Sequence, residues 1–181
     1  SHRNHGVDYY TVPLRVPRLS GTEDLLNLIT ADPSAELWQP RQWVELEGEV
    51  RSYSNRTGVG SRLVITVLVR AARRTYPGEG ENRLVLAGVL CKPPVRRRTP
   101  LGREICDLLL AVNRPYGRAD YLPCIAWGSL AVLCGGMTVG DDLRLEGRLQ
   151  SRQYRKMVDG RETVRTAYEV SVMNLLPAPE G

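Results

Sequence analysis

Apolar and polar residues alternate with a period of two in the second half of the chain. Leu143, Leu145, Gly147 and Leu149 fall on one face of an extended segment over residues 143–154. This alternation is typical of an antiparallel strand with one buried and one solvated face. We expect the solvated face to carry Arg144, Glu146, Arg148, Gln150, Arg152 and Tyr154.

Further segments of the same half also have the character of strands. They are residues 84–90, 104–113, 120–127 and 164–174, and residues 128–136 can hold one short helix that ends at a Gly-Gly pair. About five strands and one helix in such a short segment are typical of a small, partly open barrel. The oligonucleotide-binding (OB) fold is the leading example of this architecture.

The first half of the chain repeats this unit. Aligned positions keep their order while the offset rises from 96 to 103 residues, and it changes only where loops are expected. We therefore predict an all-β chain of two tandem OB-fold barrels, each a five-stranded Greek key with at most one short helix. The matches include Leu14 with Leu110, Arg18 with Arg114, Asp24 with Asp120, residues 44–50 with 143–149, and Val67 with Val170.

The two copies are separated by a segment rich in proline, glycine and polar residues. We expect a first copy over residues 1–72, a linker over 73–82 and a second copy over 83–176. The first copy has no counterpart to residues 83–96, so we expect it to lack its opening strand. N-terminal truncation is the favoured explanation.

Composition excludes several classes of protein. The 181 residues are 42% hydrophobic and 25% charged, as in an ordinary globular protein, and no apolar run is long enough to span a membrane. The cysteines form no CxxC pair, so we expect no metal site and reduced thiols. Reduced thiols are typical of the cytoplasm, and we expect a cytoplasmic, nucleoid-associated protein without a cofactor. The cysteines are Cys91, Cys106, Cys124 and Cys134.

Positive charge is concentrated in the second half. Residues 1–82 hold ten Arg and ten acids, whereas residues 83–181 hold 13 Arg and 2 Lys against ten acids, a net charge of +5. Arginine can bind phosphate through two hydrogen bonds, so this excess of positive charge indicates a polyanionic partner. A solvated charged surface, with arginine enriched by a GC-rich genome, is the alternative.

Seven stretches of the second copy follow one another in the order found in a known family. They are residues 82–88, 98–104, 110–114, 120–128, 139–141, 145–154 and 166–172. In these stretches the second copy resembles the bacterial single-stranded DNA-binding protein family. The resemblance implies sequence-independent binding of single-stranded DNA that protects exposed strands during replication, recombination or repair.

The family binds DNA by stacking bases on aromatic rings framed by basic residues. The resemblance places these rings at Tyr116, Tyr121, Trp127 and Tyr154. Period-two alternation supports it, because Tyr121, Ile125 and Trp127 share one strand face, opposite Leu122, Cys124 and Ala126. Packing of the rings in the barrel is the alternative. The basic residues expected to neutralise phosphates are Arg96, Arg97, Arg98, Arg114, Arg118, Arg148, Arg152 and Arg155.

The first copy departs from this pattern. Non-aromatic residues stand opposite the four rings, namely Ser20, Leu25, Ala31 and Asn55. Its solvated strand face carries three acids that would repel a phosphate backbone: Glu45, Glu47 and Glu49. We expect this copy to be a degenerate partner that binds DNA weakly or not at all.

Other functions are less consistent with the sequence. His2 and His5 are the only histidines, which leaves little for a nucleophilic catalytic site. The Gly-containing segment 57–61 is better interpreted as a hairpin tip than as a phosphate loop. We therefore expect that the protein is not an enzyme. A primosome-type protein-interaction module and a single-stranded RNA binder remain alternatives.

The resemblance also implies partners. Family members commonly assemble four barrels, so two barrels per chain predict a homodimer. Members typically end in a disordered tail with an acidic tip, which is absent here. Replication or repair proteins remain possible partners, but recruitment through such a tail is not expected.

Overall fold

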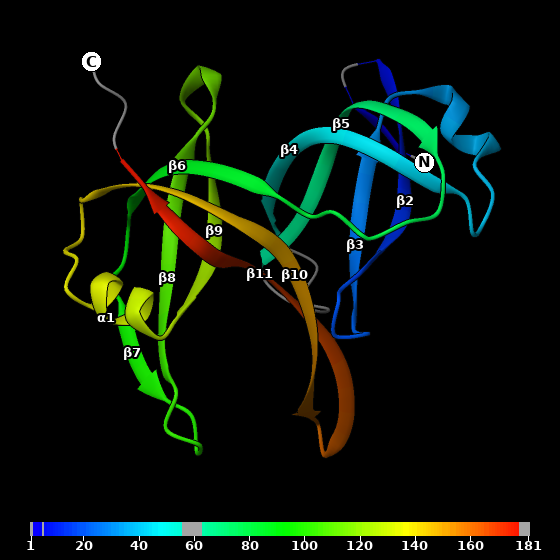
Figure 1. Ribbon diagram of the computed structural model, residues 1–181. Helices are drawn as coiled ribbons and strands as arrows, with labels where there is room; N and C mark the ends of the chain where they lie inside the picture. Colours follow the sequence, from blue (N-terminus) through cyan, green and yellow to red (C-terminus); the bar gives the residue numbers. More distant parts are fainter. Residues whose placement is uncertain (1, 5, 56–62, 178–181) are drawn as a thin grey trace. The chain divides into compact units, whose positions relative to one another are not determined.

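The computed structural model describes residues 2–4, 6–55 and 63–177. These residues form two compact units, Ser1–Glu81 and Asn82–Gly181 (Figure 1). The predicted hairpin tip at residues 57–61 lies outside the described residues. Within the part of the chain that is described, no helix is long and apolar enough to cross a membrane.

The second unit, green to red in Figure 1, is a closed β-barrel. Its sheet order is β6-β10-β11-β9-β8, and β6 pairs again with β8, which closes the barrel; β7 lies at the edge of β8. The β9–β11 pair is parallel and the other pairs are antiparallel. The strands are β6 (Leu84–Leu90), β7 (Val95–Arg98), β8 (Glu104–Asn113), β9 (Ala119–Trp127), β10 (Asp142–Val158) and β11 (Arg161–Leu176).

This arrangement confirms the predicted all-β class and the OB topology of the second copy. The short helix also occurs where it was expected, as α1 (Ser129–Gly135), which packs against β8 and also contacts β7 and β9 (Figure 1). A one-turn 3-10 helix, η2 (Pro115–Gly117), lies between β8 and β9.

The barrel closes at a point where two backbones approach closely. A Cβ atom on Gly88 of β6 would lie 2.7 Å from the carbonyl oxygen of Ala111 on β8, so glycine is needed there. Inside the barrel the leucines of four strands are fully buried, which is the main apolar stabilisation of this unit. They are Leu90, Leu110, Leu122 and Leu145.

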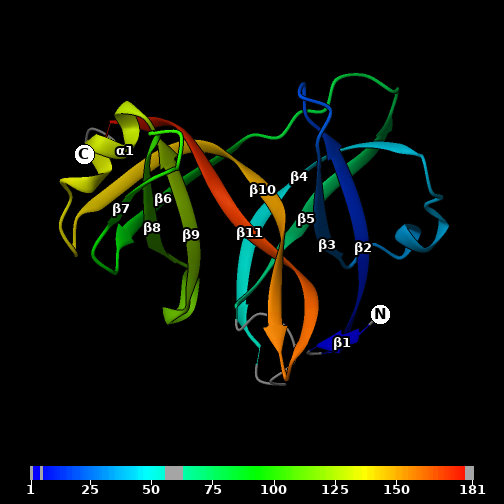
Figure 2. The ribbon, with the colours of Figure 1, turned by 90° about the horizontal axis from the view of Figure 1, so that it is seen from below.

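Strands β10 and β11 are longer than the sequence pattern predicts. They continue to a turn at Asp159 and Gly160, both with positive φ. Residues 153–166 pair only with one another among the described residues, so they form a two-stranded arm beyond the barrel (Figure 2).

The first unit, blue to cyan-green in Figure 1, is an open sheet. Its strand order is β1-β2-β3-β5-β4. In the second unit β6 pairs with both β8 and β10, which correspond to β2 and β4. No described strand of the first unit pairs with both β2 and β4 in this way. Strands β2-β3-β5-β4 nevertheless repeat the order β8-β9-β11-β10 of the second unit, as the predicted OB-fold repeat requires, and five strands are described in this unit. They are β1 (His2–Asn4), β2 (Val7–Pro17), β3 (Glu23–Thr30), β4 (Trp43–Ser54) and β5 (Leu63–Thr75), with a 3-10 helix η1 (Pro33–Leu37).

The boundary of the linker also needs correction. Residues 73–75 belong to β5 and pair with residues 43–45 of β4, so the connecting segment begins later than predicted. Pairing with β4 sets this boundary, and the sequence of residues 73–75 alone does not reveal that pairing.

The repeat extends to a buried ion pair that each unit uses at the same turn. Arg18 pairs with Asp24 in the first unit, and Arg114 pairs with Asp120 in the second. Both carboxylates are inaccessible to solvent. In each unit the arginine N–H also donates to the carbonyl four residues later, at 2.8 Å and 2.7 Å. The ion pair therefore fixes the hairpin between the two strands.

All four cysteines are free thiols. Burial raises the pKa of Cys134 to about 11 and also raises the pKa values of Cys106 and Cys124. These three thiols are therefore protonated at neutral pH and are weak nucleophiles.

Candidate nucleic-acid interface

The strand register of the second unit aligns one outward face across four strands. Trp127 on β9 lies opposite Ile105 on β8, and Ile125 lies between Asp107 on β8 and Ser171 on β11. Because paired residues project to the same side of a sheet, this face continues from β8 to β10. We call it the outward face of the second unit.

Two of the predicted rings lie on this face. Tyr121 is 47% exposed and Trp127 is half-buried, whereas the alternate residues Leu122, Cys124 and Ala126 are buried. The predicted division of β9 into a core face and an outward face is thus confirmed. Ile125 departs from it in one respect, because it is 3% exposed although it lies on the outward face.

Trp127 has a neighbour that the sequence analysis missed. The guanidinium carbon of Arg103 lies 4.6 Å from the centroid of the Trp127 ring, a cation–π contact. Arg103 follows the turn between β7 and β8, so only the fold brings it to the end of β9. No signal in the sequence identifies the contact.

Tyr116 lies at the tip of the β8–β9 hairpin, at the other end of β9 from Trp127. Its side chain is fully exposed, and its backbone adopts a left-handed conformation with φ of 71° and ψ of 31°. This conformation is unfavourable for a bulky residue and is retained mostly at functional sites. An exposed ring on a strained turn therefore supports a binding role for Tyr116.

Substituting Tyr116→Asn is expected to separate binding from stability. Asparagine adopts the left-handed region more readily, so we expect the free energy of unfolding to stay equal or to rise by up to about 1 kcal/mol. Loss of one stacking ring should weaken binding of single-stranded DNA by about 1–3 kcal/mol. Urea denaturation and an oligothymidine titration measure the two effects. Unchanged DNA affinity would remove Tyr116 from the interface.

Tyr154 lies on the two-stranded arm, opposite Arg165 on β11. The guanidinium carbon of Arg152 lies 6.0 Å from the centroid of its ring. Arg155, one residue further along, is exposed and pairs with Glu162 at 3.4 Å. The arm therefore presents Tyr154 and Arg155 beyond the barrel, and Arg152 lies just before it.

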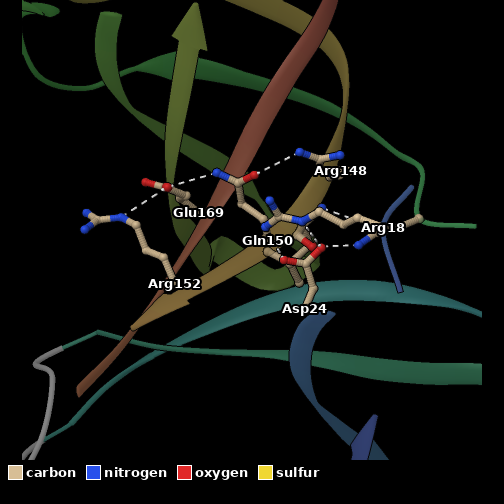
Figure 3. A network of polar contacts seen from close by, with 8 residues as sticks. Arg18, Asp24, Arg148, Gln150, Arg152 and Glu169 are labelled. Carbon is tan, nitrogen blue, oxygen red and sulfur yellow. Dashed lines mark hydrogen bonds and ion pairs between the residues drawn. The ribbon is translucent and has the colours of Figure 1, made fainter. Parts of the chain in front are cut away.

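A polar network connects β10 and β11 on the outward face (Figure 3). The side-chain amide of Gln150 donates to the Glu169 carboxylate at 3.0 Å and accepts from Arg148 at 3.3 Å. The Nε of Arg152 also donates to Glu169, at 3.3 Å. Gln150 and Glu169 are both 8% exposed, so the expectation that Gln150 is solvated is wrong. Period two predicts the face of a residue but not what packs over it.

The Glu169 carboxylate places a negative charge among the arginines of the outward face. Glu169→Gln keeps a hydrogen-bonding group beside Gln150 and removes the charge, so DNA affinity should rise by roughly threefold at low salt. Glu79→Gln, in the exposed connecting segment, makes the same change of charge at a residue that does not belong to this face. Fluorescence anisotropy with labelled oligothymidine measures both variants. A lower affinity for Glu169→Gln would show instead that Glu169 organises the arginines for binding.

The three arginines of β7 are exposed but paired with acids of β8. Arg96 and Arg98 both donate to Glu104, at 3.3 Å and 2.7 Å, and Arg97 donates to Asp107 at 2.7 Å. Hydrogen bonds from Arg98 and Arg96 lower the pKa of Glu104, which therefore stays ionised at neutral pH. These arginines would have to exchange a carboxylate for a phosphate on binding.

Arg114 has a different position from the one expected. It forms the buried pair with Asp120, its Nε lies 2.8 Å from Oδ2, and its side chain is 16% exposed. Contact with phosphate would leave the buried Asp120 carboxylate unpaired, which is costly. We therefore leave Arg114 out of the interface. Arg118 is exposed after the tip of the same hairpin and is a better placed cation.

The acidic row of the first unit is partly neutralised. Glu45 pairs with Arg73, and Glu49 pairs with Arg51 and with Arg70, the latter at 3.1 Å. The face has mixed charge, so the expectation of uncompensated acids needs correction. The order of residues along the chain does not reveal these pairs, because Arg70 and Arg73 lie on the neighbouring strand β5.

Comparison with known proteins gives the class to which this fold and face belong. The single-strand binding protein family matches residues 81–176, and the chain belongs to this family. A single-stranded DNA-binding protein of Halalkalibacterium halodurans is 33% identical over 103 residues, 53% of this chain and 61% of that protein. Single-stranded DNA-binding protein A of Bacillus subtilis is 34% identical over 107 residues, 55% of this chain and 62% of that protein.

The solved structures agree on the fold. The wild-type single-stranded DNA binding protein from Thermus aquaticus superposes with a TM-score of 0.71 and 22% identity, covering 96% of this chain and 81% of that one. The chain spans less than two thirds of the length of these two sequence relatives.

Proposed function

We propose that the second unit binds single-stranded DNA without sequence preference, by stacking bases on aromatic rings and pairing phosphates with arginines. The bound strand would be protected during replication, recombination or repair, with no chemical step. Stacking suits this role because every base has a π-face. The proposed contacts are Tyr116, Tyr121, Trp127 and Tyr154, with Arg96, Arg97, Arg98, Arg118, Arg148, Arg152 and Arg155.

One observation supports this proposal most. The exposed Tyr121 and the half-buried Trp127 lie on the same face of β9, and the strained, exposed Tyr116 stands at the tip of the adjoining hairpin. Rings used only for packing would lie on the core face with Leu122 and Ala126. The names of the relatives agree with this choice of ligand.

Single-stranded RNA is the second candidate, because ring stacking scarcely distinguishes ribose from deoxyribose. Fluorescence anisotropy with labelled oligothymidine tests DNA and RNA as ligands. The competitors are unlabelled oligothymidine, oligouridine and duplex DNA of equal length. The proposal predicts competition by unlabelled oligothymidine, little by duplex, and a salt slope near −3.5 if roughly five phosphates are paired. Stronger competition by oligouridine would favour RNA, and absence of binding at low salt would contradict the proposal.

The homodimer stays a prediction. Light scattering at micromolar concentration measures the mass directly. A dimer of the 20.2 kDa chain is expected, and a monomer across the concentration range would contradict this.

A further inference from the structure

Arg103 differs from the other arginines of the β7–β8 hairpin. Arg96, Arg97 and Arg98 each pair with a carboxylate, whereas no ion pair involves Arg103 among the described residues. Its guanidinium lies over the Trp127 ring instead. Arg103 is exposed and Trp127 is half-buried. The cation thus covers part of a ring that the proposed function uses for stacking.

The backbone of Arg103 is held in place by one residue. Thr99 donates its N–H to the Arg103 carbonyl at 2.9 Å, and the Arg103 N–H donates to the Thr99 hydroxyl at 3.0 Å. Gly102 takes the left-handed conformation, with φ of 84°, that closes this turn. On the other side, the Gly128 N–H donates to the Glu104 carbonyl at 3.0 Å, which connects the turn to the residue after Trp127. Only the side chain of Arg103 is therefore left to move.

We propose that Arg103 is a nucleotide-contacting residue that covers Trp127 in the free protein and exchanges the ring for a phosphate when a base stacks there. This inference rests on the proposed function. The exchange is favourable because stacking of a base on an aromatic ring is stronger than an exposed cation–π contact. The displaced guanidinium has no ion-pair partner among the described residues, and it gains a phosphate that the fixed turn holds within reach.

Two substitutions separate the two roles of Arg103. Arg103→Ala removes the cover and the charge, and Arg103→Lys keeps the charge but lacks the planar group that stacks on the ring. Lys92→Ala is the control, since Lys92 is an exposed cation in the loop before β7. All variants carry Trp38→Phe and Trp43→Phe, so that Trp127 is the remaining tryptophan of three.

The first measurement uses free protein. Acrylamide quenching of Trp127 fluorescence should increase in both Arg103 variants and stay unchanged in Lys92→Ala. Equal quenching in all proteins would overturn the proposed cover. This result does not depend on DNA, so it is independent of the proposed function.

The second measurement is the salt dependence of oligothymidine binding. Arg103→Ala should reduce the magnitude of the salt slope by about 0.7. The ratio of the parent's affinity to that of the variant should therefore fall about threefold when salt is raised from 50 to 200 mM. Arg103→Lys should keep the slope of the parent protein. An unchanged slope for Arg103→Ala, in a parent that binds DNA, would overturn the phosphate contact. Absence of binding by the parent would contradict the proposed function instead.

Discussion

Replacing Tyr121 and Trp127 together with leucine is expected to reduce affinity for oligothymidine at least about thirtyfold. Each stacking ring contributes about 1–3 kcal/mol, so two rings contribute about 2–6 kcal/mol. Neither substitution changes a charge, so the salt slope should stay the same. Affinity is measured by anisotropy of labelled oligothymidine over a series of salt concentrations.

Tyr76→Leu is the matched control for this experiment. Tyr76 is 90% exposed in the segment that connects the units and lies outside the proposed interface. Its substitution should leave affinity unchanged. Circular dichroism checks that the double variant keeps its fold. A loss of less than threefold in a folded double variant would mean that bases do not stack on β9.

Substituting Asp120→Ala is expected to have the largest effect on stability. It leaves the mostly buried Arg114 guanidinium without its carboxylate, and breaking a buried pair on one side costs about 3–5 kcal/mol. Unfolding of the second unit can be followed in urea by Trp127 fluorescence when Trp38 and Trp43 are phenylalanine. The variant should unfold at a much lower urea concentration.

A double substitution tests the electrostatic cause of this loss. Arg114→Met with Asp120→Leu removes both charges and keeps apolar volume, so it should recover much of the lost stability. Asp142→Ala, at the exposed start of β10, should have little effect. If the double variant is no more stable than Asp120→Ala, packing rather than an unpaired charge explains the loss.

Periodicity was sufficient to predict the barrel of the second unit and the two faces of β9. Alternating Leu122, Cys124 and Ala126 are apolar because they face the core, and that pattern is visible in the sequence. The repeat aligned Arg18 with Arg114 and Asp24 with Asp120, but it did not show that each arginine pairs with the aspartate of its own unit. Only burial of Asp120 shows that Arg114 belongs to the fold rather than to a phosphate site.

What the sequence could not predict depends on contacts between distant strands. Arg103 reaches Trp127 across the hairpin turn, and Gln150 is buried beside Glu169 although it lies on a nominally solvated face. Likewise, Glu45 and Glu49 of β4 are paired with arginines of β5. Counting charges along the chain treats each residue as isolated, whereas strand register decides which charges are neutralised.

The most direct test of the central claim is the fluorescence of Trp127 during titration with oligothymidine. The protein would carry Trp38→Phe and Trp43→Phe, so that the signal comes from β9 alone. Strong quenching that saturates with DNA, and that is reversed by added salt, is the predicted result. Tight binding without any change in Trp127 fluorescence would contradict base stacking on the outward face of the second unit.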